Sequence, residues 1–493
     1  MGKKVQIKSD FSSVLLPSGV FDAGETTVLT DAEYAALDAA TLRAVTLLTT
    51  TTEPTRTTPV AIPVVSGLIS RKVVPLRAFQ GLKRNLELGR TVGVGLLGDS
   101  TGNDTTEWFY MLGQSLAAMY PVYTVQSRLW NDTTQQFDPP VTIQTGPGGA
   151  QYLDCVADAA KNTLLTKGKH PASGNLDIRI KLASTNWGSN PALANLASRS
   201  GVSGQYSHWI NYTTGRTIQF VYSTTGANTL TATSTAAVPF TNSQVGWVRV
   251  VAIGNNGTQA EFRFYTSTDG VTWTQLGATV NATTYTLYDG GYSFEFGGRG
   301  VLNFPGSIYE TEFRDGENGP LMAPSLPGLY GPNPLSTPDA TVKGAPVLTL
   351  VNGSRPGADI TYLGDSTRLP KMTPDYGQVL TFTSDSHNET TTGLDWLTLY
   401  RNWLTSIAAR QRGPLVAVTQ NPQAPTNTGA GAHLTRRLEL LSLVDERSVI
   451  DTYQLFLDYG STYYPDLMVD TVHPNSTGST MWRDLVLAHF NAA

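Results

Sequence analysis

Thr91-Val-Gly-Val-Gly-Leu-Leu-Gly-Asp-Ser100 is the stretch that decides the fold of this 493-residue chain. Its first seven residues form a continuous apolar run bounded by turn signals, which predicts a buried parallel strand of an α/β sheet. The run leads directly into the tight loop Gly98-Asp-Ser-Thr101. Beyond the loop, Asp104 and Glu107 have capping-box spacing and apolar residues recur at helical intervals. The predicted order is strand, tight loop, helix.

The α/β pattern is interrupted and then resumes. Residues 165–316 contain short stretches of alternating apolar and polar residues separated by Gly, Asn and Asp turns, a pattern typical of an all-β sandwich. Apolar strand signals return at 347–351, 378–383 and 415–420, with helical stretches between and after them. We therefore expect one α/β domain formed by 71–164 and 317–493, with the sandwich inserted into it.

Residues 1–70 look like a compact attachment element. They contain a short strand signal, a turn, a helical pattern at 29–44 and a Thr-rich run at 46–59 that is expected to be a linker. A chain of this length exceeds what one hydrophobic core usually supports, which favours two large domains and a smaller terminal one.

Composition excludes several classes of protein. Apolar residues make up 40% of the chain, charged residues 15%, and the formal net charge is -5. Without a Lys/Arg-rich run, the chain lacks the electrostatic signature of a binder of nucleic acid or anionic membranes, so neither partner is expected. The single Cys155 forms no intramolecular disulfide and is interpreted as a small buried apolar side chain. The first residues lack the apolar core of a signal peptide, so secretion by that route is not expected.

Three residues have the chemistry of a serine hydrolase. A serine hydroxyl is a weak nucleophile, so it needs a histidine base within hydrogen-bond reach and a third group that orients the histidine. Ser100 follows the buried strand, and Asp470-Thr-Val-His473 near the C-terminus places a carboxylate three residues before a histidine. Asp470 can fold back onto the imidazole from the same loop.

These motifs resemble the SGNH (GDSL) hydrolase family, whose sequence blocks supply Ser, Gly, Asn and His. Gly98-Asp-Ser100 is similar to the first block, and Asp470-x-x-His473 is similar to the fourth. The resemblance covers roughly residues 75–160 and 340–493. It implies a three-layer α/β/α fold with a flavodoxin-like parallel sheet, hydrolysis of carboxylic or acetyl esters, and no cofactor or metal.

The two middle blocks are expected to supply the oxyanion hole. Val351-Asn-Gly-Ser-Arg-Pro-Gly-Ala358 is similar to the second block and implies that the backbone N–H of Gly357 is a donor, together with that of Ser100. Where the family usually has Gly-x-Asn-Asp, this chain has Ser386-His-Asn-Glu389, so Asn388 is the implied side-chain donor. His387 either lines the site or is structural, the commoner role for a lone histidine.

A second Gly-Asp-Ser-Thr copy, at residues 364–367, competes with the first for the nucleophile. Only the first follows a buried strand, leads into a helix and precedes the other blocks in family order. Ser100 is therefore the expected nucleophile, and Ser366 is not.

The β-sandwich resembles concanavalin-A-like and laminin-G-like jelly rolls, although a fold alone does not establish sugar binding. Its tryptophans either stack on sugars or, as is commoner, pack in the core; they are Trp187, Trp209, Trp247 and Trp273.

The N-terminus is similar to attachment modules of actinobacterial phage minor tail and head-fibre proteins. The leading hypothesis is a virion fibre protein, acting at the host surface, that binds a cell-surface polysaccharide and cleaves its ester groups. Virion structural proteins are expected as partners, and a homotrimer is one possible assembly. The rivals are a bacterial carbohydrate or lipid esterase without a virion role, and an inactive glycan-binding adhesin.

Overall fold

The computed structural model describes most of the chain beyond residue 73. The described residues are the strand segments 2–7, 13–16, 19–22, 26–29, 45–51 and 164–166, together with 74–155, 174–188, 193–200, 204–290, 294–299, 302–323, 341–384, 387–389, 393–411, 413–443, 448–460 and 465–493.

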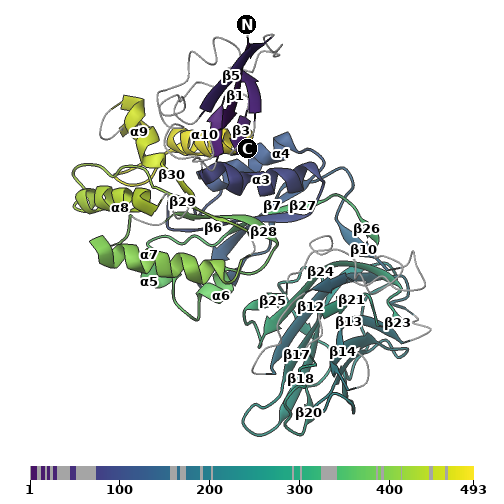
Figure 1. Cartoon of the computed structure of the whole chain (residues 1–493). Coiled ribbons are helices and arrows are strands. Elements are labelled where there is room, and N and C mark those ends of the chain that lie inside the picture. The colour runs from purple at the N-terminus through teal and green to yellow at the C-terminus, as the bar shows by residue number, and fades with distance from the viewer. Residues whose placement is uncertain are drawn as a thin grey trace.

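A parallel sheet forms the centre of the α/β domain (Figure 1). Its parallel strands are β6 (Val92–Gly98), β7 (Thr124–Asn131), β27 (Val347–Asn352), β28 (Gln378–Ser384), β29 (Leu415–Val418) and β30 (Ser448–Ile450). The spatial order is β30-β29-β28-β6-β27-β7. Two short strands, β8 (Gln136–Phe137) and β9 (Val141–Gln144), pair with β7 antiparallel. Without β7, the remaining five strands follow the chain order 2-1-3-4-5 of flavodoxin-like sheets, and the order reverses at β6.

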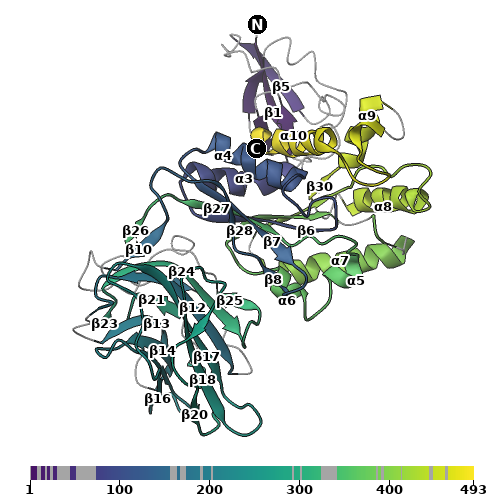
Figure 2. The ribbon, with the colours of Figure 1, turned by 180° about the vertical axis from the view of Figure 1, so that it is seen from behind.

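Helices cover both faces of this sheet, as the opposite views in Figures 1 and 2 show. One face carries α3 (Val74–Glu87), α4 (Trp108–Met119) and α10 (Ser476–Ala492). The other face carries α5 (Ile360–Leu363), α6 (Leu369–Met372), α7 (Gly393–Ala408) and α8 (Ala430–Ser442). In sequence, α9 (Thr452–Gly460) lies between α8 and α10. Each layer has its own core: Trp108 stacks on Trp482 at 5.3 Å in the first, and Trp396 and Trp403 are buried in the second. Every residue of β6 is buried because both faces are covered, which explains its unbroken apolar run.

Helix α4 begins later than its capping-box spacing suggests. Glu107 is the residue before the helix, and its side chain accepts a hydrogen bond from the backbone N–H of Asp104. The Asp104 carboxylate accepts instead from Thr106, two residues along. Only one half of a capping box is therefore formed, and it closes the loop that leads into the helix rather than the first helical turn.

The β-sandwich consists of two antiparallel sheets that enclose one apolar core. The first has the order β19-β18-β17-β12-β24-β10-β26 and the second β11-β21-β13-β14-β15-β16. Their strands are β10 (Tyr152–Asp154), β11 (Leu164–Thr166), β12 (Leu176–Ser184), β13 (Ala194–Ser200), β14 (Tyr206–Tyr212), β15 (Ile218–Tyr222), β16 (Leu230–Thr233), β17 (Val245–Ile253), β18 (Ala260–Ser267), β19 (Thr274–Gln275), β21 (Phe294–Phe296), β24 (Gly306–Asp315) and β26 (Thr341–Lys343). Short strands β20 (Val280–Ala282), β25 (Leu321–Ala323) and the pair β22 (Gly298–Arg299) and β23 (Leu302–Asn303) complete it. The fold class expected from the sequence, an α/β domain with an inserted β-sandwich, is confirmed.

The sheet of the sandwich extends beyond residues 165–316 in both directions, because β10 and β26 belong to it and pair with each other. The chain enters and leaves the sandwich at one point, where the N–H of Ala345 donates to the carbonyl of Gly149 at 3.1 Å. Both ends of the insertion therefore meet beside the parallel sheet.

A buried ion pair joins the two domains. Arg128 on β7 donates to Glu310 on β24 at 2.5 Å, and both side chains are almost fully buried. The Arg128 guanidinium also lies over the ring of Tyr376, 4.9 Å from its centroid. Burial raises the pKa of Glu310, and the nearby Arg128 charge opposes that rise. Because breaking a buried pair leaves an uncompensated charge, these contacts hold the sandwich against the edge of the parallel sheet.

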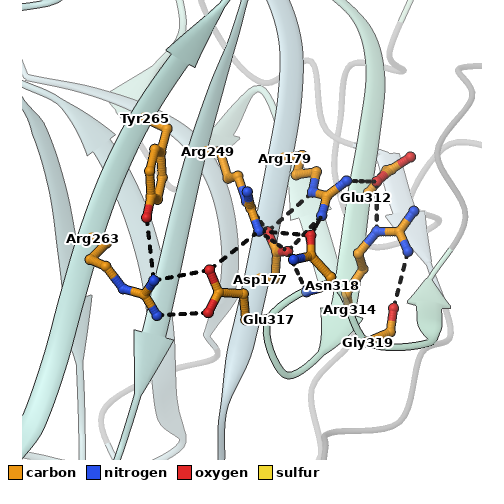
Figure 3. A network of polar contacts seen from close by, with 10 residues as sticks. All are labelled: Asp177, Arg179, Arg249, Arg263, Tyr265, Glu312, Arg314, Glu317, Asn318 and Gly319. Atoms are coloured by element: carbon orange, nitrogen blue, oxygen red, sulfur yellow. Dashed lines mark hydrogen bonds and ion pairs between the residues drawn. The ribbon is translucent and has the colours of Figure 1, made fainter. Parts of the chain in front are cut away.

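The outer face of the first sandwich sheet carries a network of ion pairs (Figure 3). Asp177 is fully buried and accepts hydrogen bonds from both Arg179 and Arg249, at 2.7–3.2 Å. Burial alone would raise the pKa of Asp177, but the two guanidinium groups hold it well below its usual range. The loop residue Asn318 accepts hydrogen bonds from both arginines, and the neighbouring Glu317 pairs with Arg249. Charges on this face are thus paired with one another.

Near the N-terminus, β1 (Gly2–Ile7) pairs with β4 (Thr26–Leu29) and β5 (Val45–Thr51), and β2 (Ser13–Leu16) pairs with β3 (Gly19–Asp22). Strand β5 contains the first part of the Thr-rich run that we expected to be a linker, so that part forms sheet. The rest of the run and the helical pattern expected at 29–44 fall almost wholly outside the described residues. Over the described part of the chain, no helix combines the length and apolar character needed to cross a membrane.

Candidate active site

Strand β6 delivers Ser100 to the carboxyl edge of the parallel sheet, where the strand order reverses and ligands usually bind. The strand ends at Gly98, where a Cβ atom would lie only 2.5 Å from the carbonyl oxygen of Ser384 on β28. Glycine therefore allows the close approach of the two strand ends. Asp99 then turns the chain, since its carboxylate accepts hydrogen bonds from the backbone N–H and the hydroxyl of Thr101.

Asp99 is a buried carboxyl group directly beside Ser100. Its side chain is 1% exposed, and burial raises its pKa, while hydrogen bonds from Gln420 and Thr101 oppose the rise. Ser100 itself is partly exposed. The loop therefore buries the aspartate and leaves the serine hydroxyl accessible.

The loop before α10 carries the histidine. One oxygen of Asp470 accepts hydrogen bonds from the backbone N–H groups of Val472 and His473, each at 2.7 Å. The other oxygen lies 2.7 Å from His473 Nδ1. Burial alone would raise the pKa of Asp470, but these hydrogen bonds from His473 and Val472 lower it. Asp470 thus shapes the loop and orients the ring at the same time.

Ser100 and His473 are 373 residues apart in sequence but lie in contact in the fold. His473 Nε2 lies 2.7 Å from Ser100 Oγ, which completes a chain of hydrogen bonds from Asp470 to the serine. The side chains of His473 and Asp470 are 38% and 51% exposed. With Nδ1–H directed at the carboxylate, Nε2 is available to accept the serine proton.

Gly357 lies in a tight turn next to the nucleophile loop. The turn is closed by a hydrogen bond from the N–H of Ala358 to the carbonyl of Arg355, with Pro356 and Gly357 at its centre. Gly357 has φ +71°, the left-handed conformation that the third position of a type II turn requires and that glycine adopts without strain. The N–H of Arg355 donates to the carbonyl of Gly98, which ties the turn to the end of β6.

Asn388 connects the same two segments. Its side-chain amide donates to the carbonyl of Ala358 at 3.0 Å and to Asp99 at 3.4 Å. The neighbouring Glu389 accepts a hydrogen bond from the backbone N–H of Ile360, the first residue of α5. The glutamate at this position therefore anchors the loop to the helix. Ser386, the other departure from the family pattern, falls outside the described residues.

His387 is a buried structural residue. Only 7% of it is exposed, its Nε2 lies 2.8 Å from the carbonyl of Asn421, and its ring packs against that of His433. Burial lowers the pKa of His387 to about 3, so the imidazole is neutral near physiological pH. It packs beneath the site as a neighbour of Asn388 in sequence. Of the two roles considered from the sequence, this is the structural one.

Ser366 is exposed and lies on the segment between α5 and α6, whereas Ser100 is the serine that contacts His473. Its loop has the same local turn as the first copy, because Asp365 accepts from the backbone N–H and hydroxyl of Thr367. The turn is therefore a local property of the Gly-Asp-Ser-Thr sequence, whereas the histidine partner belongs only to Ser100.

Two residues that the sequence analysis did not single out connect the loops of the site. Gln420 and Asn421 follow β29 after one residue, Thr419, at the same carboxyl edge as Ser100. The carbonyl of Asn421 is 2.8 Å from His387 Nε2, and its side chain donates to the carbonyl of Val472 at 2.8 Å, beside His473. Polar residues at the end of a buried parallel strand were the signal that could have identified them.

The sandwich tryptophans have different environments. Trp187 is fully buried and packs edge-on against Tyr212 and Phe240 in the core. Trp273 is partly exposed on the outer face of the first sheet, where it lies over Arg249 and in edge contact with Trp247. Trp209 is 7% exposed on β14.

Within the described residues, no group of three or more His, Cys, Asp or Glu side chains is arranged to hold a metal ion.

Comparisons with known proteins give likenesses of structure only. No family model and no curated protein matches the chain. Among solved structures, a peptidoglycan O-acetylesterase is similar over 85% of this chain and 95% of its own, with 10% identity and a TM-score of 0.33. A variant of an acetyl xylan esterase from Geobacillus stearothermophilus is similar over 29% of this chain and 73% of its own, with 15% identity and a TM-score of 0.24. The CBM40 domain of a Ruminococcus gnavus sialidase is similar over 31% of this chain and 89% of its own, with 16% identity and a TM-score of 0.23.

Proposed function

We propose that this chain is a serine esterase of the SGNH type, with Ser100 as nucleophile, His473 as general base and Asp470 as the residue that orients the base. The observation that supports the proposal most strongly is the continuous hydrogen-bonded line from Asp470 through His473 to Ser100, with both steps at 2.7 Å. Such a line is the arrangement that activates a serine hydroxyl.

The reaction follows from this geometry. Ser100 Oγ attacks the acyl carbon while His473 Nε2 takes its proton, and the resulting imidazolium is stabilised by the Asp470 carboxylate. The tetrahedral oxyanion is stabilised by the N–H groups of Ser100 and Gly357 and by the Asn388 amide. Collapse of the intermediate expels the alcohol, which receives the proton from His473. Water, deprotonated by the same histidine, then hydrolyses the acyl-enzyme and releases the carboxylic acid and free Ser100.

The substrate class we propose is the O-acetyl ester of a cell-surface polysaccharide. Ser100 is partly exposed and the His473 and Asp470 side chains are 38% and 51% exposed, which supports access of a polymer chain to the site. The β-sandwich packs against the same domain through the buried Arg128–Glu310 pair, which holds it at a constant position relative to the esterase. A sandwich held in this way is suited to binding a polysaccharide while the site removes its acetyl groups.

We further propose that the protein works in a bacteriophage tail or head fibre, acting at the host cell surface. The resemblance of residues 4–38 to phage attachment modules supports this role, as does a chain with one cysteine that depends on packing rather than disulfides. Virion structural proteins would be its partners, and assembly as a homotrimer is part of the same proposal. Immunogold labelling of particles from a lysogen or lysate tests it: absence of the protein from every virion would leave a bacterial esterase.

Acetate release tests the enzymatic proposal. Purified protein is incubated with host cell-wall polysaccharide, and with a chromogenic acetyl ester, beside a Ser100→Ala variant as the matched control. We expect acetate from both substrates with the wild-type protein and none above background with the variant. Binding to polysaccharide without hydrolysis of either ester would replace the proposal with that of an inactive adhesin.

A further inference from the structure

Gln420 lies between the two loops whose separation matters for catalysis by the proposed mechanism. It follows β29, and its side chain is 0% exposed. One loop is the nucleophile loop, residues 99–101, which follows β6. The other is the loop of His387 and Asn388, which follows β28. The strands β29 and β6 flank β28 in the sheet, so a side chain at the end of β29 must reach across β28 to contact both loops.

Both ends of the Gln420 amide are used in this bridge. Its Nε2 donates to Asp99 Oδ1 at 2.7 Å and to Thr101 Oγ1 at 2.9 Å, on either side of Ser100. Its Oε1 accepts the backbone N–H of His387 at 2.7 Å, one residue before Asn388. A third, longer contact joins Nε2 to the carbonyl of Ser384 at 3.4 Å.

The chemistry of the primary amide suits this place. The Nε2 group has two hydrogens, which match the two acceptors Asp99 Oδ1 and Thr101 Oγ1, and Thr101 uses its own hydroxyl hydrogen toward Asp99. Oε1 has lone pairs that accept from His387. A carboxylate could not donate, and an aliphatic side chain could neither donate nor accept. Such a buried amide favours one orientation because each partner left unsatisfied would destabilise the folded state.

We infer that Gln420 is a positioning residue that holds the oxyanion donor Asn388 in register with the nucleophile Ser100. The inference rests on the proposed serine-esterase function. It adds the side chain that sets the distance between the Ser100 loop and the Asn388 loop. The contacts described for Gln420 are with Asp99, Thr101, His387 and the carbonyl of Ser384 rather than with the serine hydroxyl, so its effect on catalysis is indirect. A displacement of about 1 Å at such a site can reduce the rate on the order of a hundredfold.

The first test compares two buried glutamines. Gln378, at the opposite edge of the sheet, is 1% exposed and also bridges backbone groups, with Oε1 accepting from Tyr376 and Nε2 donating to Pro374. We expect Gln420→Ala to lower kcat on a chromogenic acetyl ester by about 10- to 100-fold with KM within about twofold, and Gln378→Ala to leave kcat within about threefold at a comparable loss of Tm. Equal kcat values in the two variants would overturn the inference.

A double-mutant cycle with Asn388→Ala distinguishes positioning from a general structural effect. If Gln420 acts by holding Asn388 opposite Ser100, its loss has little further effect once Asn388 is absent. We therefore expect Gln420→Ala to lower kcat less than about threefold in the Asn388→Ala background. A full multiplicative loss in that background would show that Gln420 acts by another route and would refute the inference.

Gln420→Glu gives an independent readout that preserves the side-chain volume. When protonated, the new carboxyl group can still donate to Asp99 and accept from His387; when ionised, it faces the buried Asp99 carboxyl group as a second acceptor. The ratio of variant to wild-type kcat should therefore rise as the pH falls from 8 to 5.5. A ratio that stays constant across this range would contradict the proposed donor role.

Failure of the inference is separable from failure of the proposed function. If the wild-type protein neither hydrolyses the ester nor becomes labelled by a fluorophosphonate at Ser100, the esterase proposal itself fails. If the wild-type protein is active and Ser100→Ala is inactive, while Gln420→Ala matches Gln378→Ala, only the positioning role fails.

Discussion

Asp470→Asn separates the two jobs that the Asp470 carboxylate performs. Oδ1 accepts the backbone N–H groups of Val472 and His473, and Oδ2 contacts the His473 ring. An asparagine keeps an oxygen that can accept both backbone hydrogen bonds, so the loop should retain its shape. Its amide nitrogen, however, faces His473 Nδ1 as a donor. The ring is then driven to the tautomer with hydrogen on Nε2, which points a donor rather than a base at Ser100.

The size of the loss follows from the exposure of the pair. In a fully buried triad this substitution lowers kcat by about 10⁴-fold. Here the side chains of His473 and Asp470 are 38% and 51% exposed, so water can solvate Nδ1 and part of the ring population keeps the productive tautomer. We therefore expect a loss of about 10²- to 10³-fold, equivalent to about 2.7–4 kcal/mol of transition-state stabilisation. His473→Ala should cost more, as much as loss of Ser100, because the triad acts as a unit.

Steady-state kcat/KM on a chromogenic acetyl ester at a fixed pH measures this prediction, with circular dichroism and Tm to show that the variant is folded. Asp470→Ala is the informative control, since it removes the wrong donor but also removes both loop hydrogen bonds. If Asp470→Asn stays within threefold of wild type while His473→Ala abolishes turnover, the histidine needs no orienting carboxylate and the assignment of Asp470 is wrong.

Three further predictions test the site, the electrostatics and the domain division. Ser366→Ala should leave esterase activity unchanged whereas Ser100→Ala abolishes it, and the opposite result in the same assay would reverse the assignment of the nucleophile. Burial raises the pKa of Glu107 from 4.5 to about 8, so the folded state favours the protonated carboxyl group and the free energy of unfolding should fall as the pH rises from 4.5 to 8. Glu107→Gln should therefore raise Tm more at pH 8.5 than at pH 5. An equal change in Tm at both pH values would contradict this. Joining Gly149 directly to Ala345, which are already hydrogen-bonded at 3.1 Å, should leave a folded α/β domain that hydrolyses a small acetyl ester but loses turnover on polysaccharide; equal loss on both substrates in a folded variant would mean that the sandwich forms part of the active-site wall.

Much of the architecture could be predicted because it depends on local patterns. The unbroken apolar run before Gly98 requires a strand covered on both faces, and the alternating stretches of 165–316 require sheets covered on one face. The boundaries of the β-sandwich were harder to predict from the sequence. Strands β10 and β26 have three residues each, too few for periodicity to reveal. They join the sandwich sheet because β10 pairs with the edge of β24, and β26 then pairs with β10.

In the candidate site, too, some contacts follow from local sequence and others depend on the fold. Asp470 and His473 are three residues apart, so their contact is encoded locally and the spacing alone suggests it. The residues that Gln420 bridges lie far from it in sequence, at 321, 319 and 33 positions. Its importance could not be derived from spacing because it depends on which strand ends are neighbours in the sheet.

The two Gly-Asp-Ser-Thr copies show what each level of structure decides. By itself the sequence determined the turn, since Asp99 and Asp365 both accept from the threonine two residues on. Only the tertiary structure places a histidine, His473, next to one of the two serines, Ser100. Ser100 follows a central strand at the point where the sheet order reverses, and His473, 373 residues away, contacts it there. A hydroxyl becomes a nucleophile only within hydrogen-bond reach of a base, and the packing of distant elements sets that distance.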